Sequence, residues 1–182
     1  MLDGSLSMRK LESTVVTVAD NIIEYLAVRS KELDQETRVS VYIFNDTVKC
    51  VIFDKDVLRL PSLKGIYTTN GNTALIDATI KSQEDLADTS ELYGDHSFLT
   101  YVLTDGEENR SRNRTANLKN MFDKLPAHWT VAVFVPNIQA EHEAKRFGFP
   151  AGNVEKWYTS SVRGLENAGA GSDWPGHADR PR

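Results

Sequence analysis

The sequence contains very little cysteine, with Cys50 as the one residue of this type among 182. A single cysteine excludes an intramolecular disulfide and is typical of a protein from a reducing compartment. Cys50 falls in an apolar stretch, so we expect a buried strand residue rather than a reactive thiol. Histidine is also scarce, and the 4 histidines lack the spacing of zinc or copper ligands.

Long apolar runs and an excess of positive charge are also lacking. No run approaches the roughly 20 residues of a membrane-spanning helix, and no secretory signal pattern is present, so we expect a cytoplasmic protein with no membrane partner. The 21 lysines and arginines against 26 aspartates and glutamates give a formal net charge of -5. Because basic side chains supply most nucleic-acid affinity, this balance argues against a nucleic-acid partner.

The remaining composition is that of a globular domain. With 182 residues, of which 40% are hydrophobic, the chain is long enough to bury one substantial core. Residues 168–182 are rich in glycine, proline and charge, a composition typical of disorder. We therefore expect one folded domain over residues 1–167 and a disordered tail over residues 168–182.

The first part of the chain has clear helical and strand periodicity. Apolar residues at helical spacing predict a long helix from about residue 8 to 35. Two strand-like segments follow, Arg38–Phe44 and Val48–Phe53, with the polar turn Asn45–Thr47 between them. These segments predict an antiparallel hairpin. Residues 58–72 are polar and punctuated by glycine and proline, so we expect a loop.

Strands and helices alternate in the rest of the chain. The predicted elements are a helix from Ala74 that ends before Gly94, a strand at Phe98–Leu103, a helix at Thr115–Lys124, a strand at Val131–Val135, a helix at Ala140–Phe147, a strand at Val154–Tyr158 and a short helix near Ser161–Asn167. This alternation predicts a three-layer α/β fold, in which a mostly parallel sheet carries the hairpin at its edge and helices cover both faces.

Oxygen-bearing side chains occur in three segments that such a fold would bring together. Asp3, Ser5 and Ser7 alternate just before the long helix, Thr73 precedes the second helix, and Asp105 follows a buried strand. Ligands of these sheets bind outside the carboxyl ends of the strands, so we expect the three segments to meet there. Each residue alone could be an ordinary helix cap or turn residue. Their combination in this order favours a metal site.

The type of donor predicts the type of ion. Carboxylate and hydroxyl oxygens suit Mg²⁺, with Mn²⁺ as a possible substitute. Two of the five proposed donors are carboxylates, so a divalent ion would remain electrophilic and keep an open position. A carboxylate from a partner protein could fill that position.

These residues carry a resemblance to the von Willebrand factor type A (vWA) domain. The metal-ion-dependent adhesion site (MIDAS) of that family has an Asp-x-Ser-x-Ser motif, a threonine and a later aspartate. The corresponding residues here are Asp3, Ser5, Ser7, Thr73 and Asp105. Gly71–Ala78 and Thr104–Asn109 support the resemblance, which covers about Met1 to Gly164. The sequence is most similar to short, single-domain intracellular versions from bacteria and their phages.

The resemblance implies a Rossmann-like sheet with a Mg²⁺-mediated protein-binding site at one edge. In that family the serines and the threonine supply direct or water-bridged oxygens, and the aspartates often act through water. A glutamate or aspartate of the bound protein typically completes the metal shell. The resemblance therefore implies a protein partner that presents an acidic residue.

The sequence departs from the family pattern at two places. Leu6 stands where the family usually has glycine, which predicts a stiffer or more apolar loop. The first strand, normally a hydrophobic run before the aspartate, is reduced to Met1 and Leu2 and is apparently missing. Unpaired backbone groups in such a gap cost about 1 to 3 kcal/mol each if buried. We therefore expect that the natural reading frame starts upstream or that another segment fills the gap.

Two other functions are compatible with the sequence. In a Mg²⁺-dependent hydrolase, Asp3 or Asp105 would hold the metal, and Glu107 or Glu108 would activate water. Such enzymes commonly need a second acidic residue two positions from the first, where this chain has methionine and serine. No activated nucleophile is evident, so we expect a binding protein rather than an enzyme. The other possibility is a degenerate scaffold that keeps the fold and binds no metal.

Overall fold

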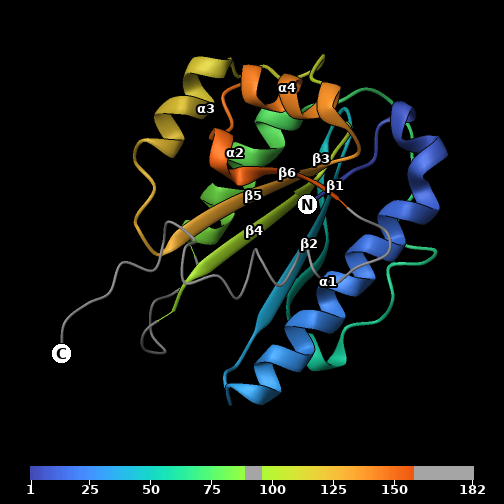
Figure 1. Ribbon diagram of the computed structural model, residues 1–182, viewed down its shortest axis with the longest axis vertical. Helices are drawn as coiled ribbons and strands as arrows, with labels where there is room; N and C mark the ends of the chain where they lie inside the picture. The colour runs from blue at the N-terminus through green and yellow to red at the C-terminus, as the bar shows by residue number, and fades with distance from the viewer. Residues whose placement is uncertain (89–95, 158–182) are drawn as a thin grey trace.

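The computed structural model describes residues 1–88 and 96–157, and within these ranges six strands form one sheet (Figure 1). The strands are β1 (Leu2–Asp3), β2 (Arg38–Phe44), β3 (Val48–Asp56), β4 (Phe98–Leu103), β5 (Trp129–Val135) and β6 (Val154–Lys156). Their order is β3-β2-β1-β4-β5-β6, and every neighbouring pair is parallel except the β2-β3 hairpin. The predicted mostly parallel sheet with an antiparallel edge hairpin is confirmed.

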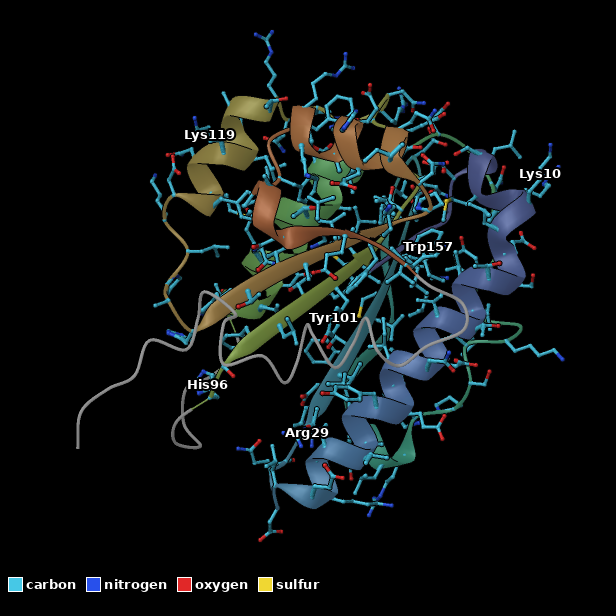
Figure 2. All side chains as sticks on the ribbon, viewed as in Figure 1. Lys10, Arg29, His96, Tyr101, Lys119 and Trp157 are labelled. Carbon is cyan, nitrogen blue, oxygen red and sulfur yellow. The ribbon has the colours of Figure 1, made fainter. Side chains whose placement is uncertain are left out.

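Helices cover both faces of the sheet, as predicted (Figure 1). The α-helices are α1 (Glu12–Glu32), α2 (Leu75–Ala87), α3 (Thr115–Phe122) and α4 (Ile138–Arg146), and the 3-10 turns are η1 (Leu6–Leu11), η2 (Val57–Arg59) and η3 (Ala151–Asn153). Helix α1 packs on one face, in a cluster with Tyr101 and Trp157 (Figure 2). Helices α2, α3 and α4 pack on the other face. The fold therefore has three layers.

The helix predicted for residues 8–35 is present but begins as a 3-10 turn, η1, before α1 takes over at Glu12. The buried residues Val15, Val18, Ala19 and Ile22 recur at the spacing that places them on one face of α1, and this face packs on the sheet. The spacing in the sequence thus identified the inward face of α1 correctly.

The expectation of a missing first strand is corrected in part, because the two-residue strand β1 lies between β2 and β4. Leu2 pairs with Ile43 and Leu103, and Asp3 pairs with Phe44. Strand β2 has 7 residues and β4 has 6, so in the described parts of the chain no strand lies between them along most of their length. We call this part of the sheet, where the backbones of β2 and β4 are not joined through β1, the wedge.

The amino group of Met1 lies at the closed end of the wedge. It donates a hydrogen bond to the Tyr101 carbonyl oxygen at 2.6 Å, and burial lowers its pKa to about 5. Desolvation disfavours the charged form, so protonation of the amino group is unfavourable at this buried position. Among the described residues, the backbone of residues 1–3 thus occupies the carboxyl end of the central position of the sheet.

Cys50 is exposed, so the expectation that it is buried is wrong. It does lie on a strand, but β3 is the outer strand of the sheet and none of its 9 residues is buried. An apolar stretch at a sheet edge is only half covered by the helices, which explains the error. The Cys50 thiol donates to the Ile52 carbonyl oxygen at 3.1 Å.

The remaining predicted elements up to residue 157 agree with the structure within a few residues. The short helix near residues 161–167 and the tail over residues 168–182 lie outside the described residues, and the domain limits remain a prediction. No helix in the described ranges combines the length and the apolar character that crossing a bilayer requires.

Candidate metal centre

The end of β1 and the loop after it contain Asp3, Ser5 and Ser7, whose side-chain oxygens take part in a row of hydrogen bonds. Asp3 is 0% exposed, and each of its carboxylate oxygens accepts a hydrogen bond. The Ser5 backbone N–H donates to Oδ1 at 2.9 Å, and the Thr104 hydroxyl donates to Oδ2 at 2.7 Å. The hydroxyls of Ser5 and Ser7 are 3.0 Å apart. Ser5 is buried and Ser7 is exposed, so this row of oxygens leads from the interior to the surface.

No basic side chain among residues 1–88 and 96–157 balances the charge of Asp3 with an ion pair. Burial raises the pKa of Asp3 to about 6, although the hydrogen bonds from Thr104 and Ser5 act in the opposite direction. The negative charge of Asp105 raises the pKa further, which places the two carboxylates in the same electrostatic environment. Within the described ranges, neither carboxylate forms an ion pair. Such a pair of carboxylates favours a bound cation.

The loop that carries Thr73 lies against the Asp3 loop. Three hydrogen bonds join the two loops: from the Tyr67 hydroxyl to the Asp3 carbonyl oxygen, from the Asn70 N–H to the Gly4 carbonyl oxygen (2.7 Å), and from the Leu6 N–H to the Gly71 carbonyl oxygen (3.0 Å). Leu6, which replaces the glycine of the vWA pattern, is 51% exposed and makes the surface of its loop more apolar. Thr73 itself is buried.

The loop after β4 carries Asp105 and reaches both of the other segments. Asp105 is half-buried, and its Oδ1 accepts the Glu107 N–H at 3.2 Å. The Asn109 amide oxygen accepts the Thr73 N–H at 2.9 Å, and the Thr73 carbonyl oxygen accepts the N–H groups of Asn109 and Arg110, both at 3.0 Å. This loop thus binds both the N–H and the carbonyl oxygen of Thr73.

The three predicted segments therefore meet at the carboxyl edge of the sheet, and we call residues 3–7, 67–73 and 104–113 the rim. Asp3, Ser5 and Ser7 are in one hydrogen-bonded row. Thr73 and Asp105 are linked to that row through the backbone of their loops and through Thr104. The structure thus brings all five proposed ligands to one region, and their role as ligands remains a prediction.

Sequence reasoning missed Thr104 and Tyr67, which both bind Asp3. One signal for Thr104 was available in the sequence, because this residue directly follows the predicted strand β4. In the structure β4 is a neighbour of β1, the strand that contains Asp3. Nothing near Tyr67 in the sequence indicates its contact with a residue 64 positions away. Both hydroxyls orient the Asp3 loop through hydrogen bonds, and neither is a proposed metal ligand.

Glu108, a proposed base of the hydrolase alternative, is occupied by other contacts. Its carboxylate accepts four hydrogen bonds, from the Ile76 N–H (2.8 Å), the Arg110 N–H (3.0 Å), the Ser111 N–H (2.9 Å) and the Ser111 hydroxyl (2.7 Å). Both oxygens are used, so this carboxylate fastens the loop and does not resemble a base with a free oxygen for water. The Glu107 side chain is exposed.

Comparison with known proteins gives a likeness in structure and none in sequence. No protein-family model matches the sequence, and no curated protein matches it. Proximal thread matrix protein 1 from the mussel byssus, in a structure with a zinc-occupied MIDAS motif, is similar with a TM-score of 0.59 and 12% identity. The match covers 92% of this chain and 42% of the mussel protein, so this chain spans less than half of that protein.

A second structure of the mussel protein gives a TM-score of 0.56 at 14% identity, over 91% of this chain and 42% of that one. An aerotolerance-related membrane protein from Bacteroides fragilis, with multiple mutations to serines, gives 0.55 at 13% identity, over 92% of this chain and 94% of that one. Identities this low speak for the fold alone. Together with the strand order and the loops at the carboxyl edge, these likenesses show that the chain has the vWA fold.

Proposed function

We propose that this chain is a protein-binding module that grips an acidic residue of its partner through a divalent ion, Mg²⁺ or in its place Mn²⁺. The observation that carries the proposal is the buried Asp3 carboxylate, which lies near Asp105 and has no basic side chain to balance it among the described residues. The residues that would hold the ion are Asp3, Ser5, Ser7, Thr73 and Asp105. The bound ion would supply positive charge and an open position for the partner's carboxylate.

The donors fit a hard cation, because all five are oxygens. Zinc occupies the MIDAS motif of the mussel protein, which supports a divalent ion on this fold. The choice of Mg²⁺ over zinc rests on this chain's own donors, since no histidine or cysteine belongs to the rim. The cytoplasmic location remains a prediction from the sequence.

The chain's own residues would prepare the site in two ways. The Ser5 N–H and the Thr104 hydroxyl fix both oxygens of Asp3, so its carboxylate is oriented before any ion arrives. Ser7 is exposed at the outer end of the row, which gives a partner access from the solvent side. Leu6 beside it would offer an apolar contact to the same partner.

Calorimetric titration and thermal melting with Mg²⁺ and Mn²⁺ test the proposal. We expect both ions to stabilise the wild-type chain, by about 2.7 kcal/mol at a hundredfold excess over the dissociation constant, and to leave Asp3→Asn unchanged. Glu107→Gln is a matched control, because it neutralises an exposed carboxylate of the same rim. The absence of metal heat from a wild-type chain with an intact circular dichroism spectrum would select the degenerate scaffold instead.

The partner's part is tested separately. Any protein captured by the wild-type chain in Mg²⁺ should be released by EDTA and should not bind Asp3→Asn. Equal capture in EDTA would show that the metal is irrelevant to recognition. We favour binding over catalysis because the Glu108 oxygens are already hydrogen-bonded. Turnover of a generic phosphate ester that disappears in Asp3→Asn would reverse that preference.

A further inference from the structure

Two carboxylates fasten the loop after β4 to the start of helix α2. Glu108 accepts the Ile76 N–H at 2.8 Å and is also bonded to Ser111, as described above. Asp77 accepts the Arg112 N–H at 2.8 Å, and both the N–H and the side-chain amide of Asn113 at 2.9 Å. The two carboxylates are linked, because the Asp77 N–H donates to the Ser111 hydroxyl, which in turn donates to Glu108.

These contacts replace the usual cap of helix α2. The N-terminal N–H groups of a helix have no partner within the helix, and a negative charge near them is favourable. Ala74, the residue before α2, offers no side-chain cap. Glu108 and Ser111 satisfy the N–H groups of Ile76 and Asp77 from a loop about 30 residues further along the chain. The start of α2 is therefore fixed by its contacts with the Asp105 loop, and the side chain at its N-cap position makes no capping hydrogen bond.

The position of this fastening relates it to the candidate metal centre. Ile76 lies three residues after Thr73, and Glu108 lies three residues after Asp105. We propose that Glu108 is a positioning residue that holds Thr73 and Asp105 as one unit, so that both reach the ion in a fixed relation. This inference rests on the metal-dependent function proposed above. The other donors are arranged by contacts that do not include Glu108: Ser5 is hydrogen-bonded to Asp3 and Ser7, and Asp3 also accepts from Thr104.

The role requires a carboxylate rather than any polar side chain. Four donors converge on the two Glu108 oxygens. A glutamine has the same size but one acceptor oxygen, and its amide group would face backbone N–H groups that also donate. Glu108→Gln therefore removes at least two of the four hydrogen bonds with little change in volume.

The test compares Glu108→Gln with Glu107→Gln, the matched control at the neighbouring exposed position, by Mn²⁺ calorimetry and by amide hydrogen exchange in EDTA. We expect Glu108→Gln to weaken Mn²⁺ binding by roughly 10-fold, the lower end of the loss seen when an outer-shell partner of a ligand is removed, because Glu108 bonds to the ligand loops and not to the ligands themselves. The exchange of the Thr73 and Ile76 amides should rise in the metal-free variant, while that of Ser5 stays unchanged. Glu107→Gln should behave as the wild type in both measurements.

Wild-type Mn²⁺ affinity in folded Glu108→Gln would overturn the inference and leave the proposed function intact. A wild-type chain that binds no metal would overturn both. If Glu108→Gln does not fold, Ser111→Ala decides, because it removes the hydroxyl that joins Glu108 and Asp77. A smaller loss of affinity in Ser111→Ala supports the inference, and an unchanged affinity contradicts it.

Discussion

The rim and the opposite end of the sheet are built differently. At the rim, buried polar groups such as Asp3 and Thr104 are paired with one another. At the opposite end, which we call the far end, the wedge separates β2 from β4, and large apolar side chains face solvent, with Phe53 70% and Leu99 42% exposed. The rim thus combines the candidate ligands with buried polar groups that are paired with one another. Substitutions should therefore cost most at the rim and least at the far end.

Gly106→Ala should give the largest loss. Gly106 has a φ of +83°, and a Cβ there would lie 2.6 Å from the Ala140 carbonyl oxygen, a backbone atom that cannot turn aside. Backbone strain and overpacking together predict a loss of about 2 to 5 kcal/mol in the free energy of unfolding, measured in urea. Gly65→Ala is the control, since its φ is +80° with no atom within 4 Å. Equal losses in the two variants would mean that the contact with α4 has no effect.

A pair of tyrosines sharpens the comparison. The buried Tyr67 hydroxyl donates to the Asp3 carbonyl oxygen at the rim, so Tyr67→Phe should cost about 1 to 3 kcal/mol. The buried Tyr101 hydroxyl beside the wedge has no hydrogen-bond partner in the described part of the chain, so Tyr101→Phe should be neutral or stabilising. Thermal melting of both variants checks the difference. A larger loss of stability in Tyr101→Phe than in Tyr67→Phe would contradict the expected difference between the rim and the far end.

Asp77→Asn should show a smaller, pH-dependent loss. Burial raises the pKa of Asp77, but the hydrogen bonds from Arg112 and Asn113 outweigh it, so the pKa is lowered overall. The carboxylate therefore stabilises the fold above its unfolded pKa of about 4 and loses this effect as the pH falls through its folded value.

Urea unfolding of Asp77→Asn should accordingly show a deficit of about 1 kcal/mol at pH 7 that shrinks below pH 4. Asp123→Asn, at an exposed position at the end of α3, serves as the control for the loss of one negative charge. A deficit that persists unchanged at low pH would exclude the carboxylate as its source.

Phe53→Ser at the far end should have the smallest effect. Phe53 is 70% exposed, so its replacement should change the free energy of unfolding by less than about 0.5 kcal/mol. Urea unfolding measures the change. A loss above 2 kcal/mol, a size typical of buried side chains, would mean that this surface is covered in solution.

The sequence predicted the elements well where a local pattern determines them. The spacing of Val15, Val18 and Ile22 predicted the inward face of α1, and the polar turn at residues 45–47 predicted the hairpin. Strand β1 was missed because two residues are too few to show a period. The burial of Cys50 was wrong because the sequence does not tell an edge strand from a central one.

The candidate site was predicted only in part for a similar reason. Asp3, Ser5 and Ser7 are visible because they alternate along the chain, and Thr73 and Asp105 are visible because they lie beside a predicted helix and a predicted strand. The residues that hold these motif residues in place cannot be recognised in the sequence. Thr104 binds Asp3 from 101 positions away, and Glu108 binds Ile76 from 32 positions away. Contacts of this kind arise from the packing of the sheet and helices, and no local pattern encodes them.

The location of Met1 has a practical consequence for protein engineering. Its amino group is buried at the wedge and bonded to the Tyr101 carbonyl oxygen, so any polypeptide fused before it starts in the middle of the sheet (Figure 1). An extended linker of β-branched residues suits such a path better than a flexible glycine linker, which has no side chains to pack. A purification label joined at this end would therefore alter the centre of the fold rather than a free terminus.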